Sequence, residues 1–274
     1  MFTLEDPALV RRFAGLASGS SNSVADAVPV FVNCFNRVSV LRSLVDWLLQ
    51  MGQQRILLLD NASTYPPLLA YYRDLAAEPR VIVVELGGNL GHTAIWASGL
   101  LDRLEWAREP FIYTDPDILP DPDCPRDFLQ HFARILEQHP AARKVGFGLR
   151  IDDLPLYYRF RAEVQDWEAQ FWEIPLAEGQ YLAPIDTTFA LYRGGTVWTP
   201  QAITAAKVYA IRTGFPYVAR HLDWYMDTEH PTEEQLYYRA HAIPGISSWS
   251  GEELPPNVQQ DVALARQGAR MIRR

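Results

Sequence analysis

Two aspartates separated by one proline, Asp115-Pro116-Asp117, form the tripeptide best suited to chemistry in this sequence. In an extended segment, residues i and i+2 point to the same side, so both carboxylates can face one ligand. They directly follow the apolar run 111–113, where a strand would end. Paired carboxylates there suit a hard divalent cation that a diphosphate also holds. The alternative is an ordinary turn, because Asp and Pro favour turns and a second such pattern, Asp121-Pro122-Asp123, follows at once.

Polar side chains also close three earlier apolar runs. They are Asn33, Asn36 and Arg37 after or within run 28–35, Asp60 with Asn61 and Ser63 after run 55–59, and Asn89 and Gly91 after run 81–86. Asp60 could accept a hydrogen bond from a nucleobase imide or a ribose hydroxyl, with an Asx turn as the equal alternative. Residues 87–91 lack the G-x-G-x-x-G spacing of a dinucleotide site, although their glycines permit close backbone approach to a ligand.

His221 is the histidine with a chemical interpretation. It lies in the stretch Arg220-His221-Leu222-Asp223-Trp224-Tyr225, which is rich in aromatic residues and weakly periodic, so we expect a loop. There the imidazole could complete a metal shell, and a simply packed or solvated histidine is the alternative. No Ser/His/Asp elbow, phosphate-loop lysine motif or HExxH pattern occurs in the sequence.

The elements that must position these residues alternate between strands and helices. We expect buried strands at 28–35, 55–59, 81–86, 111–113 and 144–149, and helices at 40–49, 66–77, 93–104 and after Asp127. This alternation predicts an α/β fold, Rossmann-like, with a mainly parallel sheet and flanking helices. Ligands bind beyond the carboxyl ends of such strands, so the four polar ends should meet at one edge.

The rest of the chain is less regular. Region 150–250 is rich in Trp and Tyr; there we expect a strand at 189–192 and a helix to Ala240 that begins with a Thr232/Gln235 capping box. An N-terminal arm, 1–27, contains a short helix and the small polar stretch 17–23, which reads as a linker. The C-terminal tail 255–274 has an apolar helical stripe and a basic end. We favour a helix packed on the core over one lying on an anionic membrane.

Composition excludes several classes of protein. The chain has 274 residues, a formal charge of −8, 48% hydrophobic and 21% charged residues, the balance of a folded globule. The acidic balance argues against nucleic acid as a partner. No apolar run is long enough to cross a bilayer, the N-terminus does not read as a signal peptide, and two cysteines cannot form a disulfide framework. We therefore expect a cytoplasmic protein, with the membrane surface as the alternative suggested by the tail.

The strand-end motifs resemble those of GT-A fold glycosyltransferases of the family-2 type. The resemblance covers residues 28–120 in the family's order and rests on four segments: 30–37, 57–63, 89–92 and 113–120. It implies that Asp60 contacts the base, Asp115 the ribose or metal, and Asp117 the metal bound to a sugar-nucleotide diphosphate. Together with the strand ends, we expect nucleotide contacts at Asn33, Asn36, Arg37, Asp60, Asn89, Gly91 and Asp115, and a Mn²⁺ or Mg²⁺ cofactor.

The resemblance also suggests a base and a third metal ligand. Inverting members of the family use a carboxylate downstream of the metal motif, often within Glu-Asp, which this chain lacks there. Asp186 is the candidate base, with Asp152, Asp153, Asp223 and Glu234 as rivals. GT-A enzymes often carry a histidine ligand about 100 residues after the aspartates, and this implies that His221 completes the metal site.

We expect a metal-dependent glycosyltransferase of glycan biosynthesis. It would transfer a sugar from a UDP-linked nucleotide-sugar donor to a hydroxyl group of an acceptor. Residues 28–124 would bind the donor and 125–254 the acceptor, within one domain. Two alternatives come from other classes. A nucleotidyltransferase would need a Gly-rich, basic loop after the first strand, where the chain has Asn36-Arg37-Val38-Ser39. A catalytically silent carbohydrate-binding subunit would bind glycan through its aromatic residues and release no nucleotide.

Overall fold

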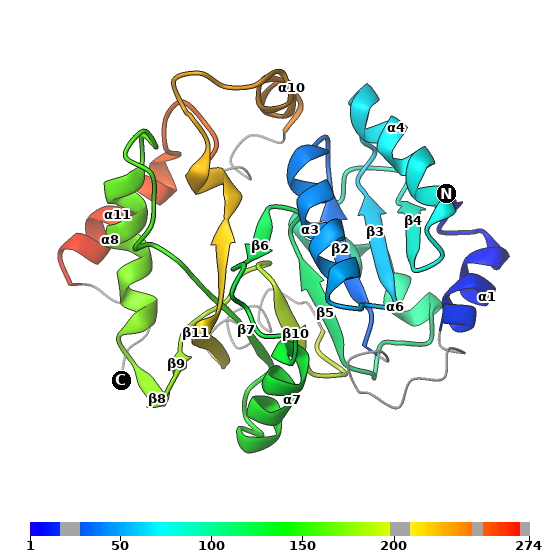
Figure 1. Ribbon diagram of the computed structural model, residues 1–274, viewed down its shortest axis with the longest axis horizontal. Helices are drawn as coiled ribbons and strands as arrows, with labels where there is room; N and C mark the ends of the chain where they lie inside the picture. The colour runs from blue at the N-terminus through cyan, green and yellow to red at the C-terminus, as the bar shows by residue number, and fades with distance from the viewer. Residues whose placement is uncertain (17–27, 198–208, 243–248, 269–274) are drawn as a thin grey trace.

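The computed structural model describes residues 1–16, 28–197, 209–242 and 249–268. Within these ranges eleven strands form one sheet in the order β1-β4-β3-β2-β5-β10-β7-β11-β9-β8, with β6 paired to β11 (Figure 1). Neighbours from β1 to β5 are parallel, whereas β10 lies antiparallel between β5 and β7. The predicted α/β fold is confirmed: the sheet is parallel in its first half and mixed in its second.

The strands span short segments with one exception, β11. Their bounds are β1 Phe2–Thr3, β2 Val30–Cys34, β3 Ile56–Asp60, β4 Val81–Glu85, β5 Phe111–Thr114, β6 Ile118–Pro120, β7 Lys144–Leu149, β8 Pro175–Ala177, β9 Gln180–Leu182, β10 Ala190–Tyr192 and β11 Ala210–His221. The helices longer than one turn are α1 Pro7–Gly15, α3 Ser39–Gln50, α4 Pro66–Asp74, α7 Phe128–Gln138, α8 Arg161–Ala169, α10 Glu233–His241 and α11 Pro256–Arg266. Among the described residues no helix is both long and apolar enough to span a membrane.

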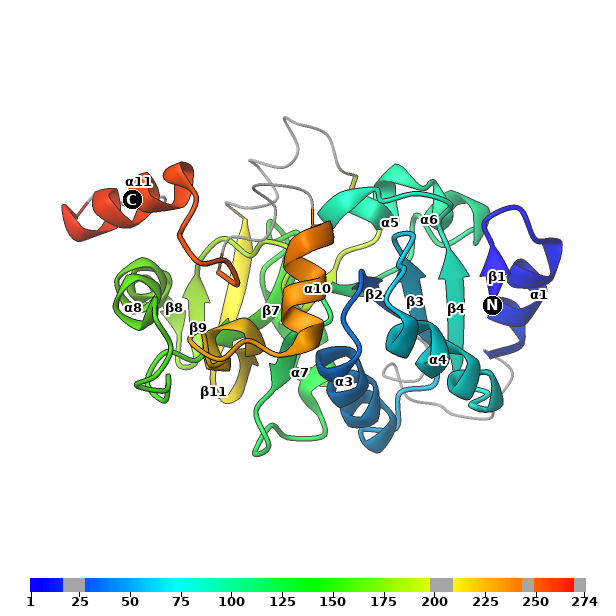
Figure 2. The same ribbon diagram turned by 90° about the horizontal axis from the view of Figure 1, so that it is seen from above.

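Both faces of the parallel strands are buried, which is why these strands read as continuous apolar runs. Alternate residues of β3, Ile56 with Leu58 and Leu57 with Leu59, belong to two hydrophobic clusters on opposite faces. Helices α3, α4 and α7 cover one face, and α1 with the short helices α5 (Ala94–Ala97) and α6 (Leu100–Arg103) covers the other (Figure 2).

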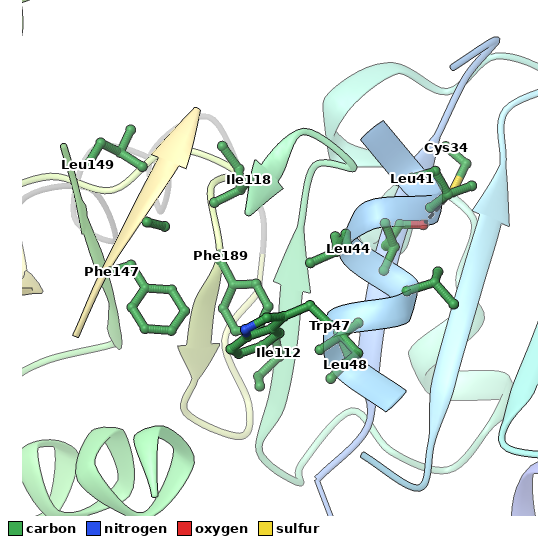
Figure 3. Close-up of a cluster of buried hydrophobic side chains, with 14 of the residues drawn as sticks. Cys34, Leu41, Leu44, Trp47, Leu48, Ile112, Ile118, Phe147, Leu149 and Phe189 are labelled. Atoms are coloured by element: carbon green, nitrogen blue, oxygen red, sulfur yellow. Dashed lines mark hydrogen bonds between the residues drawn. The ribbon is translucent and has the colours of Figure 1, made fainter. Parts of the chain in front are cut away.

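The core continues from the parallel half into the mixed half of the sheet. Trp47 of α3 packs edge-on against Phe189, just before β10, with ring centroids 6.2 Å apart (Figure 3). Phe147 of β7 lies 5.1 Å from Phe189 on the other side. One apolar layer thus joins the two halves and holds the strand ends of both at a common edge.

One predicted helix of the parallel half differs in the structure. The helix expected at 93–104 is broken into a 3₁₀ turn Gly91–Thr93, α5 and α6, because Gly99 adopts a left-handed φ of 67° that ends one helix before the next. The N-terminal arm forms the expected helix, and it packs on the sheet: β1 pairs with β4, and Leu9 and Phe13 are buried. Residues 17–23, the expected linker, lie outside the described residues.

The second half of the sheet contains the largest difference. The strand expected at 189–192 is present as β10, and α10 begins with the predicted capping box. However, the prediction of a loop around His221 is wrong. His221 is the last residue of the long strand β11, and this strand was not predicted from the sequence. A register shift between Thr213 and Val218 interrupts its pairing with β7, and this irregularity hides the strand period.

The C-terminal tail packs on the body as favoured above. In α11, Val258, Val262 and Ala265 are buried, and Arg266 pairs with Asp166 of α8 at 2.7 Å. The basic residues after Gly268 lie outside the described part of the chain.

Candidate active site

A cleft of about 560 Å³ opens at the carboxyl edge of the parallel strands, where ligands of α/β folds bind. Its lining includes most of the polar strand ends that the sequence singled out: Asn33, Arg37, Asn61, Asn89, Gly91, Asp115 and Asp117. Residues from the second half of the chain, among them Asp186, His221 and Asp223, line it as well. The structure therefore brings residues as far apart in sequence as Asn33 and Asp261 to one cavity.

Asp115 is anchored to the segment that carries Asp186. The Thr187 hydroxyl donates to Asp115 Oδ2 at 2.6 Å, and the Asp115 amide donates to the Thr187 carbonyl at 3.1 Å. Burial raises the pKa of Asp115 well above its usual value, and the nearby charge of Asp117 raises it further. Hydrogen bonds from Thr187 and Asn33 oppose this shift. Such a carboxyl is stabilised as an anion only when a cation or further donors approach it.

Asp117, His221 and Asp223 form a compact acidic cluster. One potential ligand atom from each lies within 4.8 Å of the others. The pairing of β6 with β11 produces this: His221 stands opposite Ile118, and the Leu222 amide donates to the Asp117 carbonyl at 2.7 Å. The His221 ring stacks on Trp224, with centroids 4.8 Å apart and planes 10° apart, which holds its orientation.

The cluster fits a divalent cation. Asp117 Oδ1 and His221 Nδ1 are buried and have no hydrogen-bond partner. Buried polar atoms are nearly always satisfied, so these two atoms mark a place for a ligand. Two carboxylates and an imidazole are a donor set that suits Mn²⁺ or a similar ion. Asp223 adds a ligand that sequence reasoning placed only among rival bases.

Arg37 lies between the two carboxylates of this cluster. Its Nη1 is 3.1 Å from Asp117 Oδ2 and 2.5 Å from Asp223 Oδ1, and its guanidinium lies 5.1 Å from the centre of the Tyr238 ring. Burial and Asp117 raise the pKa of Asp223, while the charge of Arg37 lowers it. Here Arg37 offsets part of the negative charge of the two carboxylates. Its expected contact with a nucleotide stays a prediction.

Asp60 and Asn36 are engaged within the protein rather than directed to the cleft. Tyr72 and the Ser63 amide donate to the two oxygens of Asp60 at 3.0 and 3.1 Å. Asn36 Oδ1 accepts from the amides of Thr64 and Tyr65 at 2.7 and 2.9 Å. Neither residue is among the described residues that line the cleft. Their roles as nucleotide contacts are untested predictions.

Asn61, next to Asp60, faces the cleft in its place. Its amide nitrogen donates to Asn33 Oδ1 at 2.5 Å, and its oxygen accepts from the Leu90 amide at 2.9 Å. Asn89 Oδ1 accepts from the Gly91 amide at 3.0 Å, which shapes the loop after β4. Asn61 thus ties the ends of β2 and β4 together on the side of the cleft where we expect the nucleotide.

Asp186 lies at the mouth of the cleft on a segment held from beneath by two buried cations. Its side chain is exposed, whereas Lys144 Nζ donates to its carbonyl at 2.9 Å. Arg212 Nε donates to the Pro184 carbonyl at 2.9 Å. These bonds fix the backbone on both sides of Ile185 and leave the Asp186 carboxylate directed by a rigid loop.

The rival bases are occupied elsewhere. Asp152 and Asp153 pair with Arg150 and Arg220, at 3.0 and 2.7 Å respectively, and neither is among the cleft-lining residues. Glu234 accepts from the Ser39 amide and hydroxyl at the N-terminus of α3. Asp223 belongs to the metal-like cluster. Asp186 is thus the candidate whose carboxylate both lines the cleft and lies outside that cluster.

Sequence reasoning missed the far wall of the cleft. It comprises Trp167, Glu168, Phe171, Arg212 and Trp249, which line the cavity opposite the strand ends. Glu168 and Arg212 are buried and joined at 2.6 Å. Arg212, an arginine that directly follows the apolar residues Ala210 and Ile211, was the signal that could have pointed to this ion pair.

No family model matches the sequence, and no curated protein matches it. Solved structures do. Mannosyltransferase PcManGT from Pyrobaculum calidifontis, in complex with GDP-Man and Mn²⁺, is 16% identical with a TM-score of 0.49, over 96% of this chain and 77% of that one. Glucosyl-3-phosphoglycerate synthase from Mycobacterium tuberculosis, in complex with phosphoglyceric acid, is 14% identical with a TM-score of 0.43, over 97% and 87%.

Proposed function

We propose that this chain is a divalent-metal-dependent glycosyltransferase that moves a sugar from a nucleotide donor, UDP-linked, to a hydroxyl of an acceptor. One observation carries the proposal: the cluster of Asp117, His221 and Asp223 lies in the cleft at the carboxyl edge, beside Asp115. So acidic a site repels a bare diphosphate. A cation held by these side chains makes the same site attractive to it.

The residues of the cleft would have different roles in the transfer reaction. Asp117, His221 and Asp223 would hold the ion, which when bound offsets the charge that builds on the departing diphosphate. Asp115, which accepts a hydrogen bond from Thr187, would bind the ribose or support the ion. During transfer the acceptor oxygen forms a bond to the anomeric carbon, and the bond from that carbon to the diphosphate breaks. The acceptor proton passes to the Asp186 carboxylate.

A screen of nucleotide sugars tests this proposal. UDP- and GDP-linked sugars are incubated with the protein and Mn²⁺ or Mg²⁺, and released nucleoside diphosphate is measured with and without chelator. Metal-dependent release supports the proposal. Release of pyrophosphate from nucleoside triphosphates would indicate a nucleotidyltransferase instead. Glycan binding without release of any nucleotide would indicate a carbohydrate-binding subunit.

His221 gives a prediction that does not require turnover. We expect His221→Ala to weaken Mn²⁺ binding by roughly tenfold or more, because one donor of the cluster is lost. Calorimetric titration of the purified variant measures the affinity. His230→Ala is the matched control, since the His230 side chain is 82% exposed and lies outside the cleft lining. Unchanged Mn²⁺ affinity in His221→Ala removes the histidine from the metal shell.

A further inference from the structure

The far wall of the cleft combines aromatic rings with a buried ion pair. Trp167 and Phe171 come from α8 and the turn after it, with ring centroids 5.5 Å apart, and Trp249 lies just before α11. All three line the cleft. Flat aromatic surfaces of this kind bind the apolar face of a ligand that also carries polar groups.

The ion pair behind these rings is rigid. Glu168 and Arg212 are 3% and 4% exposed, and Arg212 Nη1 donates to Glu168 Oε2 at 2.6 Å. The guanidinium also lies 4.2 Å from the centre of the Phe171 ring, and its Nε holds the Pro184 carbonyl. Since Asp186 follows two residues after Pro184, this ion pair is bonded to the backbone of the segment that carries the candidate base.

The cleft carries a strong excess of negative charge. Among the described residues that line it are two guanidinium groups, Arg37 and Arg212, and six carboxylates: Asp115, Asp117, Glu168, Asp186, Asp223 and Asp261. Both arginines are already paired with carboxylates, at 2.5 and 2.6 Å. The imidazole of His221 belongs to the acidic cluster and stacks on Trp224, whose ring centroid lies 6.3 Å from that of Trp249, and His92 lies in the 3₁₀ turn Gly91–Thr93. An anionic group beside the aromatic wall would meet carboxylates and no available guanidinium.

The cleft also offers groups that suit neutral hydroxyls. Trp224 Nε1 and Thr188 Oγ1 are buried atoms of cleft-lining residues, and neither has a hydrogen-bond partner. An indole N–H and a hydroxyl can each bond to an uncharged hydroxyl group. Aromatic faces, unpartnered neutral donors and surplus carboxylates thus point to one chemical class of acceptor.

We infer that the acceptor subsite selects an uncharged polyhydroxyl compound with an apolar face, such as a neutral sugar, and that Glu168 determines this selectivity by neutralising Arg212. The inference rests on the proposed function. In this arrangement the positive charge of the Arg212 guanidinium is neutralised by the carboxylate of Glu168, so no unpaired positive charge faces the cleft. Without the Glu168 charge, Arg212 becomes a site for a carboxylate or phosphate.

Paired acceptors that differ in charge test the unaltered protein. Methyl glucoside, methyl mannoside and methyl galactoside are the neutral probes, and the matching methyl uronides are the anionic ones. We expect kcat/KM to favour the neutral member by about 100-fold, since like-charge juxtaposition costs several kcal/mol. Inorganic phosphate should not compete with the neutral acceptor. Equal or better use of the uronides, or competitive inhibition by phosphate against the acceptor, would overturn the inference.

Glu168→Gln tests the residue itself. The glutamine keeps the shape and a hydrogen-bond acceptor for Arg212 but removes the charge, so the preference should narrow by roughly tenfold or more through better use of the uronide. Glu163→Gln, on the same helix but outside the cleft lining, is the matched control. Circular dichroism checks that the glutamine variant folds. If it does not fold, Glu168→Asp is used instead, because its shorter side chain moves the carboxylate away from Arg212. That variant must then also reduce the ratio of kcat/KM for the neutral acceptor to kcat/KM for the uronide. An unchanged preference in a folded variant rejects the role of Glu168.

Donor hydrolysis separates this inference from the proposed function. Release of nucleoside diphosphate with water as acceptor tests the donor site of the unaltered chain, and it should be the same in the Glu163→Gln control, whose changed residue lies outside the cleft lining. Metal-dependent hydrolysis without the expected charge preference contradicts the acceptor inference alone. No hydrolysis of any nucleotide sugar contradicts the proposed function, and titration of tryptophan fluorescence with the glycoside and uronide pairs then decides the binding preference of the wall.

Discussion

An Asp117→Ala variant is expected to show no measurable sugar transfer, a loss of roughly 10³-fold or more. Asp117 lies at the centre of the acidic cluster, within reach of both His221 and Arg37. Without it, the cation that offsets the diphosphate is held poorly, and charge stabilisation of several kcal/mol is lost from the transition state. Asp115→Ala should also abolish useful activity but be the less damaging change. Steady-state release of nucleoside diphosphate measures both.

The chain supplies its own control for this experiment. Asp123 belongs to the second Asp-Pro-Asp pattern, is exposed, and does not line the cleft. Asp123→Ala should therefore leave the rate of sugar transfer unchanged. This control separates the loss of a cleft carboxylate from the general effect of removing an aspartate from an Asp-Pro-Asp sequence. Excess chelator should act on the unaltered protein as Asp117→Ala does. Full activity in excess chelator would contradict the metal proposal.

The second large effect is expected at Asp186. If its carboxylate takes the acceptor proton, Asp186→Asn should lower kcat by roughly 10²–10⁴ while donor binding survives. Asparagine keeps the shape of the side chain, and the bonds from Lys144 and Arg212 hold the backbone, so the loop should stay in place. Turnover with saturating acceptor and calorimetric titration of the donor give the two quantities.

Two outcomes would argue against this role. Asp152→Asn is the matched control, because Asp152 pairs with Arg150 outside the cleft lining and should leave kcat unchanged. A lower melting temperature of Asp186→Asn with full activity per folded molecule would mean that Asp186 only supports the loop. Retention of the anomeric configuration in the product, read by NMR, would also exclude a simple base mechanism.

Much of the fold could be predicted because its signals are local. The parallel strands are buried on both faces and therefore appear as uninterrupted apolar runs, and β2 and β3 are each followed by a helix of regular period. The capping box of α10 is likewise a local signal, because Thr232 and Gln235 are only three positions apart. The break at Gly99 was missed because the apolar period continues across it, and only the left-handed backbone there stops the helix.

The sequence by itself determined that a polar, acidic edge exists and that Asp115 and Asp117 belong to it, since carboxyl ends of parallel strands must share one side. Only the tertiary structure decided which residues face them. The register of β11 against β6 sets His221 opposite Ile118 and so carries Asp223 to the cluster. Register between distant strands depends on packing of the whole sheet and leaves no mark in the spacing of residues. For the same reason the Glu168–Arg212 pair and the inward turn of Asp60 toward Tyr72 emerged only from the folded chain.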